Sequence, residues 1–286
     1  MDQRQCDRRI IVASHGTTYA DARAHDIGAV ERAVQAAYPG WAVRRAFTSQ
    51  PIIDRIQAHG GEKVDNLGQA LQRAVDEGVR TLVILPTHLL HGAEYERLVA
   101  TADRFRNVMA IAIAEPLLGT AASNAGVASS SLCAVTEAVA TATARDAGYG
   151  SALAAAQDGC ALVLVGHGSA HEAGAVYDQM QAEAARLGYG NVFVGTIEGE
   201  PADNSCEAVI CKVLAAGYTK VQLRPLMLVA GAHANKDMAG STPDSWKSRF
   251  EAAGITATAQ AKGLGQIAAV QQVYVHHIAD AMQRIM

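Results

Sequence analysis

The sequence predicts an α/β protein of two similar lobes, each built on a four-stranded parallel sheet flanked by helices. Short runs of β-branched and aliphatic residues alternate with amphipathic segments along all 286 residues. The runs are apolar on both faces, which is typical of parallel strands covered by helices on both sides. Each half also opens on one pattern, an apolar run followed by Ser or Gly, then His, Gly and a hydroxyl residue.

Eight apolar runs are predicted to be the strands, four in each half. They span residues 10–13, 42–47, 81–85 and 108–112 in the first half, and 161–165, 191–196, 221–223 and 255–259 in the second. Helical spacing predicts helices over residues 21–40 and 65–78. Their apolar stripes are Ile27, Val30 and Val34 in the first, and Leu67, Leu71 and Val75 in the second.

The boundary between the lobes is expected within a small-residue stretch, residues 119–145, whose valine spacing favours a helix over a linker. We place the first lobe at residues 1–125 and the second, which carries the candidate metal site, at 126–264. Residues 265–286 form a closing amphipathic helix that is expected to pack back on the first lobe.

The later strands of the two halves also correspond, because each runs into a proline. Aligning Pro86 with Pro225 places Glu94 opposite His233. Two similar sheets leave an inter-lobe cleft, and parallel sheets bind ligands at the carboxyl ends of their strands. The sequence therefore predicts a ligand site at these strand ends.

Composition excludes several classes of function. The net charge of −4 and the lack of a basic stripe argue against a nucleic-acid partner. No apolar run approaches the roughly 20 residues needed to span a bilayer, so no membrane partner is expected. Five scattered cysteines favour a reducing cytoplasm. The N-terminus lacks the apolar region of a secretory signal, although a protein whose signal peptide had been removed by processing would lack it too.

Three strand ends of the second half each present one side chain able to bind a metal or move a proton. His167 lies between two glycines directly after a buried strand, Glu198 follows the next strand, and His233 follows the proline-containing strand. Two imidazoles and a carboxylate suit Co²⁺, Fe²⁺ or Zn²⁺. Histidine also accepts protons near neutral pH.

Each residue taken alone has a structural alternative. A single His at such a turn is more often a cap or a buried hydrogen-bonded residue, and Glu198 could stabilise a helix start. Three such groups at three equivalent turns favour a site. The Arg-His-Gly of histidine phosphatases, the G-x-S-x-G elbow and the phosphate-binding P-loop are all missing.

The first half carries a weaker set, His15, His88 and His91. His88 and His91, three residues apart, are expected to share a helix face, but no carboxylate in their segment completes a site as clearly as Glu198 does. The matching turns pair His15 with Gln50 and Glu94, so this half is expected to contact substrate or solvent. His276 and His277 are expected at a surface or interface.

Together these motifs resemble the anaerobic-type sirohydrochlorin cobaltochelatases of the class II chelatase superfamily, which share the ferrochelatase fold. The resemblance covers nearly the whole chain, through "HGTTYADAR", "AFTSQPIIDRI", "THLLHGAEY", "VGHGS", "GTIEGEP" and "PLMLVAGAHANKDMAG". It implies a bilobal fold with a tetrapyrrole in the cleft. The family's metal-binding residues fall on His167, Glu198 and His233.

The resemblance implies a lyase that inserts Co²⁺ into sirohydrochlorin, an eight-carboxylate macrocycle, or its precursor during anaerobic cobalamin biosynthesis. The His/Glu/His set would hold the cation and accept pyrrole protons. Fe²⁺, Ni²⁺ or Zn²⁺ are alternative cations in vitro. Two other functions stay open: a sirohydrochlorin ferrochelatase for sirohaem synthesis, and a non-catalytic protein that binds metal or tetrapyrrole.

Further contacts follow from the same resemblance. The substrate-binding candidates are Ser14, His15, Thr17, His88, Glu94 and Met227. Candidates to pair with substrate carboxylates are Arg44, Arg45, Arg224 and Lys236. In some relatives a histidine near residue 88 is associated with haem bound between subunits; no other residue here supports haem. The sequence leaves open whether the protein forms a homo-oligomer.

Overall fold

The computed structural model describes residues 7–119, 129–169, 171–198 and 202–285. The chain divides into two compact units, one formed by Met1–Thr120 with Gln271–Met286, the other by Ala121–Val270. The boundary expected between residues 125 and 126 lies outside the described residues.

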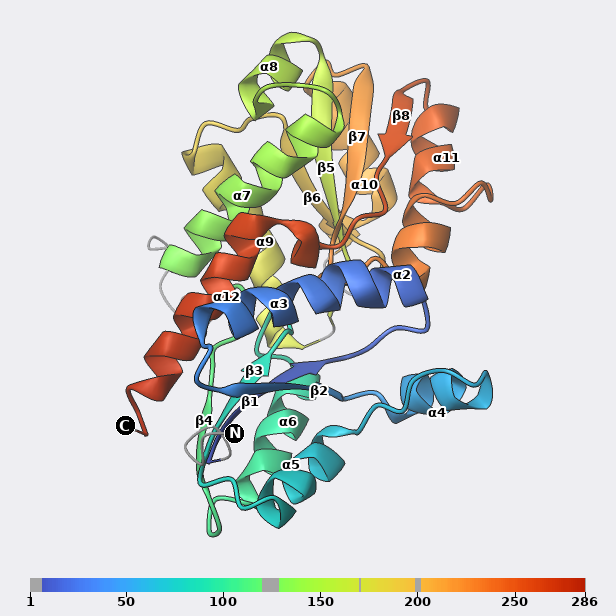
Figure 1. Cartoon of the computed structure of the whole chain (residues 1–286). Helices are drawn as coiled ribbons and strands as arrows, with labels where there is room; N and C mark the ends of the chain where they lie inside the picture. Colours follow the sequence, from blue (N-terminus) through green and yellow to red (C-terminus); the bar gives the residue numbers. More distant parts are fainter. Residues whose placement is uncertain (1–6, 120–128, 170, 199–201, 286) are drawn as a thin grey trace. The chain divides into compact units, whose positions relative to one another are not determined.

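Each unit contains one four-stranded, wholly parallel sheet, as the sequence predicts (Figure 1). The strands of the first unit, in sheet order, are β2 (Ala42–Phe47), β1 (Arg8–Ser14), β3 (Thr81–Pro86) and β4 (Ala110–Ile113). Those of the second are β6 (Val192–Thr196), β5 (Cys160–Gly166), β7 (Lys220–Leu226) and β8 (Thr256–Ala259). Corresponding strands therefore occupy corresponding places in the two sheets.

Helices join the strands in both units. In the first unit they are α2 (Ala20–Ala22), a π-helical turn (Arg23–Ile27), α3 (Gly28–Ala37), α4 (Gln50–Ala58), α5 (Leu67–Asp76) and α6 (Ala93–Asp103). In the second they are α7 (Ser130–Asp146), α8 (Ala152–Gln157), α9 (Val176–Arg186), α10 (Cys206–Ala215), a π-helical turn (His233–Met238) and α11 (Trp246–Ala252). Helix α12 (Ala268–Met282) is last. Short 3₁₀ turns occupy Glu172–Ala175, Ala202–Asn204 and Leu264–Gln266.

The first sheet is buried on both faces. On one face, Ile11 and Ile84 pack against Leu71 of α5 and Leu98 of α6. The opposite face carries α3 and α12 (Figure 1), where the hydroxyl of Tyr274 donates a hydrogen bond of 2.9 Å to the carbonyl of Thr87. Burial on both faces explains why these strands read as continuous apolar runs.

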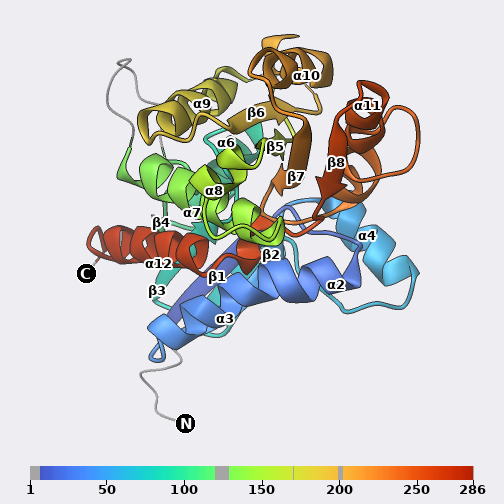
Figure 2. The same ribbon diagram turned by 90° about the horizontal axis from the view of Figure 1, so that it is seen from above.

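The second sheet is built in the same way. Val163 and Leu223 pack against Val209 of α10 and against Trp246 and Phe250 of α11. Seen from above, α7, α8 and α9 cover the other face of this sheet (Figure 2). Each core therefore holds the strands of its own sheet in fixed register, so the strand ends of that sheet are held in place as well.

Several element boundaries differ from expectation, and two of the differences have a clear local cause. The run expected at 108–112 pairs only from Ala110, because Val108 closes a turn on Phe105 and is exposed. The helix expected within 119–145 begins at Ser130, since the Ser129 hydroxyl accepts the Leu132 amide and caps it.

None of the described helices is long and apolar enough to cross a membrane.

Candidate metal centre

Three loops at the carboxyl ends of neighbouring strands carry the candidate centre of the second unit. His167 directly follows β5, and Glu198 comes two residues after β6. His233 begins the π-helical turn that follows β7. Because β6, β5 and β7 are adjacent and parallel, their ends meet at one edge of the sheet.

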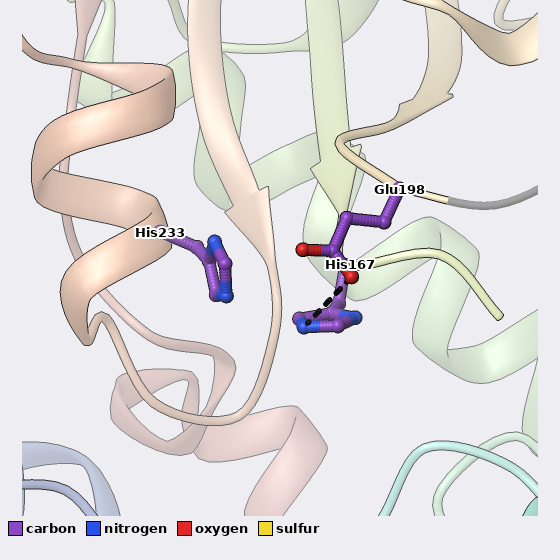
Figure 3. A group of neighbouring side chains, drawn as sticks. All are labelled: His167, Glu198 and His233. Atoms are coloured by element: carbon purple, nitrogen blue, oxygen red, sulfur yellow. Dashed lines mark ion pairs between the residues drawn. The ribbon is translucent and has the colours of Figure 1, made fainter.

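The three side chains converge. One ligand atom from each of His167, Glu198 and His233 lies within 4.8 Å of the others. The Nε2 atom of His167 is 4.0 Å from a carboxylate oxygen of Glu198. The two imidazole rings are 4.6 Å apart between centroids, with their planes at 90°. Figure 3 shows the Glu198 carboxylate above the His167 ring, with the His233 ring facing them from its own helical turn.

The backbone of the His-Gly turn sets this geometry. The Glu198 amide donates a 2.8 Å hydrogen bond to the carbonyl of His167. Gly168 has φ +94°, and a Cβ there would lie 1.5 Å from the Glu198 carbonyl oxygen. Only glycine therefore allows the two loops to approach so closely.

His233 is oriented by a residue that sequence reasoning missed. Its Nδ1 atom lies 2.7 Å from a carboxylate oxygen of Asp237, four residues along the same turn. Such a contact fixes the ring and leaves Nε2 free to ligate, as in the carboxylate–histidine pairs of known metal sites. The signal for it was the four-residue spacing, which places the two side chains on one face of a helical turn.

The centre is open to solvent. The side chains of His167, Glu198 and His233 are 49%, 61% and 37% exposed. A borderline divalent cation can therefore reach two imidazole nitrogens and one carboxylate directly from solution. Three protein ligands also leave coordination positions for donors of a second molecule.

The first unit brings together a different cluster at its matching strand ends. Nδ1 of His15 lies 2.7 Å from one carboxylate oxygen of Glu94, and the Thr48 hydroxyl donates to that same oxygen. Nε2 of His88 lies 3.4 Å from the other oxygen, and its side chain is 10% exposed. Two imidazoles thus lie on different oxygens of one carboxylate.

Charge pairing shifts the titration of this cluster. The hydrogen bond to Glu94 raises the pKa of His15, although burial and the charge of Arg97 oppose the rise. Burial favours the neutral form of Glu94, yet the hydrogen bond from His15 and the nearby imidazole of His88 together hold its pKa far below the usual range. Each partner of the His15–Glu94 pair thus favours the charged form of the other.

Two expectations about this half are wrong. His88 and His91 do not share a helix face: both precede α6, whose first residue is Ala93. Gln50 does not match Glu198, because the amide that bonds the His15 carbonyl is that of Ser49.

His91 and His277 belong to a third group, around Glu115. Nε2 of His91 is 2.7 Å from a Glu115 carboxylate oxygen, and Nδ1 of His277 is 3.0 Å from the Glu115 carbonyl. Arg284 lies 3.7 Å from the same carboxylate. His277 is buried and so does not occupy the surface position that was one of the two expected, and burial lowers its pKa. These contacts fasten α12 to the end of β4.

The remaining substrate candidates differ in exposure. Ser14 is fully buried and its hydroxyl accepts a 2.9 Å hydrogen bond from Thr87, while Thr17 is also buried. Met227 is partly exposed just after β7. Their substrate-contact roles stay predictions.

Two of the four basic candidates are already paired. Arg45 makes a bidentate contact to Glu31 at 2.6 and 2.7 Å, and Arg224 is buried against Asp146. Neither guanidinium is therefore free for a substrate carboxylate. Arg44 and Lys236 are exposed.

Known proteins are similar over nearly the whole chain. A family model described as cobalt chelatase (CbiK) matches residues 8–283. The sirohydrochlorin cobaltochelatase of Salmonella typhimurium is 32% identical over 279 residues, which is 96% of each chain. The sirohydrochlorin cobaltochelatase CbiKC of Nitratidesulfovibrio vulgaris is 29% identical over 255 residues, or 88% of this chain and 83% of that protein.

A solved structure has the same fold. SirB from Bacillus subtilis with Fe³⁺ superposes with a TM-score of 0.65 over 98% of each chain, at 13% identity. That likeness supports the two-sheet α/β architecture.

Proposed function

Because the chain belongs to the cobalt chelatase family, we propose that it inserts Co²⁺ into sirohydrochlorin, using His167, Glu198 and His233 to hold the cation. The observation that carries the proposal is the convergence of these three ligand atoms within 4.8 Å at one sheet edge. The two relatives compared above are both named for this reaction.

Insertion exchanges one dication for two protons. Co²⁺ bonds to the four macrocycle nitrogens while two pyrrole N–H groups lose their protons, so total charge is conserved. His233, oriented by Asp237, stays a ligand through the transfer. His167 releases the cation, and its Nε2 then accepts the two pyrrole protons in turn, each of which Glu198 at 4.0 Å passes to solvent before the next is accepted.

The donor set admits Fe²⁺, Ni²⁺ and Zn²⁺ as well as Co²⁺. Two imidazoles and a carboxylate do not select among these ions, since affinities follow the Irving–Williams order and availability decides. We assign Co²⁺ on family membership, and place the reaction in the cytoplasm because the described cysteines are free thiols.

Absorbance assays of purified protein with sirohydrochlorin and each metal test the proposal. His167→Ala, Glu198→Ala and His233→Ala should each lower cobalt insertion by about 10²- to 10⁴-fold, the usual contribution of a group that moves protons or holds the reacting ion. His276→Ala is the matched control, since His276 is exposed on α12 and bonds only a backbone carbonyl. Wild-type rates in all three variants would contradict the assignment.

A further inference from the structure

The first unit contains a cavity of about 350 Å³ at the carboxyl edge of its sheet. Its walls come from the end of β2, the start of α5 and one face of α6. The polar residues that line it are Thr48, Gln50, Asn66, Glu94, Arg97 and Arg104.

Two arginines supply the charge of this cavity. Arg97 and Arg104 lie seven residues apart, so they share a face of the helical segment that begins with α6. Neither has a carboxylate within 4.0 Å in the part of the chain that the structure describes. Guanidinium groups of this kind bind carboxylates in bidentate fashion.

The other polar groups leave this charge uncancelled. The Glu94 carboxylate is paired with the His15 imidazole and accepts the Thr48 hydroxyl. The amide of Asn66 donates to Gln50, whose own amide donates to Asp54. The two arginines are therefore the free donors of the cavity.

A second cavity of the same unit lies away from the strand ends. It has a volume of about 610 Å³ and lies along α3 and the middle of β2, on the flank of the sheet. Arg23, Arg32, Arg44 and Arg45 line it, and Glu31 and Glu62 hold Arg45, so position and not charge separates the two cavities. Ligands of parallel α/β sheets bind at strand ends, which favours the smaller cavity.

We propose that the cavity beside Arg97 and Arg104 binds peripheral carboxylate arms of the tetrapyrrole substrate. This inference rests on the proposed function, which supplies an eight-carboxylate ligand. Small-molecule pockets span about 300–1,000 Å³, so 350 Å³ holds the acidic arms at one edge of a macrocycle and not the whole ring. Arg97 and Arg104 each pair with a carboxylate, and the His15–Glu94 pair forms the adjoining wall.

Charge-removing variants test this. Arg97→Gln, Arg104→Gln and the double variant should raise the KM for sirohydrochlorin, by about tenfold for each lost charged contact. The kcat and the Kd for Co²⁺ alone should not change. Arg32→Gln, in the flanking cavity, is the matched control and should leave KM unchanged. Raising the salt concentration should weaken wild-type binding more than that of the double variant.

Binding of metal-free sirohydrochlorin, followed by absorbance, separates this inference from the proposed function. A wild type that binds the macrocycle without inserting cobalt refutes the function and leaves the cavity testable by Kd. A double variant with wild-type KM and Kd overturns the inference. If the double substitution weakens the binding of sirohydrochlorin and of citrate equally, as titrated calorimetrically, the cavity is a general anion site. That result also overturns the inference. Arg97→Lys and Arg104→Lys, which keep the charge, should recover part of the loss.

Discussion

The two units place a His-Gly turn at corresponding points of their two sheets, yet the two histidines have different neighbours. His167 is open and faces Glu198 and His233, whereas His15 is paired with Glu94. Both turns depend on a glycine with positive φ, at Gly16 and Gly168. The shared backbone presents an imidazole, and the residues at the neighbouring strand ends decide whether it ligates a cation or makes an ion pair.

The largest expected difference between the units is in activity. His167→Ala should lose about 10²- to 10⁴-fold in cobalt insertion, because it removes a ligand and a proton acceptor together. His15→Ala should stay within about tenfold, since it removes only the partner of Glu94. Steady-state insertion rates measure both. A greater loss for His15→Ala would reverse the roles given to the two units.

Replacing the glycine of each His-Gly turn by alanine should give the second largest difference between the two units. Gly168→Ala drives a Cβ into the Glu198 carbonyl, so it should abolish tight Co²⁺ binding and destabilise the fold by more than the roughly 1–2 kcal/mol of positive φ alone. Gly16→Ala meets the ring of the fully buried Phe47 at 2.7 Å, so it too should destabilise the fold, but it should leave Co²⁺ binding unchanged. Urea unfolding and cobalt titration measure both effects. Equal losses of cobalt affinity in the two variants would show that both glycines act on backbone conformation alone and not on the metal centre.

Asp237 gives a smaller, affinity-based difference, because it contacts His233 and not the cation itself. Asp237→Asn should weaken Co²⁺ binding by about 10- to 100-fold, since it loosens the orientation of His233. Stability should change little, because the pair is partly exposed. A Kd equal to that of the wild type would remove Asp237 from the centre.

The smallest effect is the pH dependence of the His15–Glu94 pair. The raised pKa of His15 means that its contribution to stability is full below about pH 6.5 and is lost as pH rises through the folded-state value. His15→Gln should therefore destabilise the protein at pH 6 and not at pH 9. The effect should stay below about 1 kcal/mol, since the imidazole is more than half exposed. Urea unfolding at both pH values measures it. Equal destabilisation at pH 6 and pH 9 would mean that packing, and not charge, links these residues.

Much of the fold and the centre could be predicted from the sequence. Buried parallel strands appear as apolar runs, and their ends meet at one edge, so His167, Glu198 and His233 could be grouped before any coordinates. The helix that His88 and His91 were expected to share begins only at Ala93, because Gly92 is the N-cap of α6.

The pairing of distant residues could not be predicted. Asp146 and Glu31, which engage Arg224 and Arg45, are 78 and 14 residues away from them. The contact between His15 and Glu94 spans 79 residues. Sequence periodicity reports which face a residue occupies and not which side chain lies opposite it, so the cavity beside Arg97 also escaped notice.

Cobalt binding without substrate tests the central claim most directly. Calorimetric titration and X-ray absorption spectroscopy of the bound ion should find one tightly held Co²⁺ with two imidazole ligands. That binding should disappear when His167, Glu198 and His233 are all replaced by alanine, and should persist in His15→Ala. Unchanged stoichiometry and an unchanged spectrum in the triple variant would contradict a metal centre in the second unit.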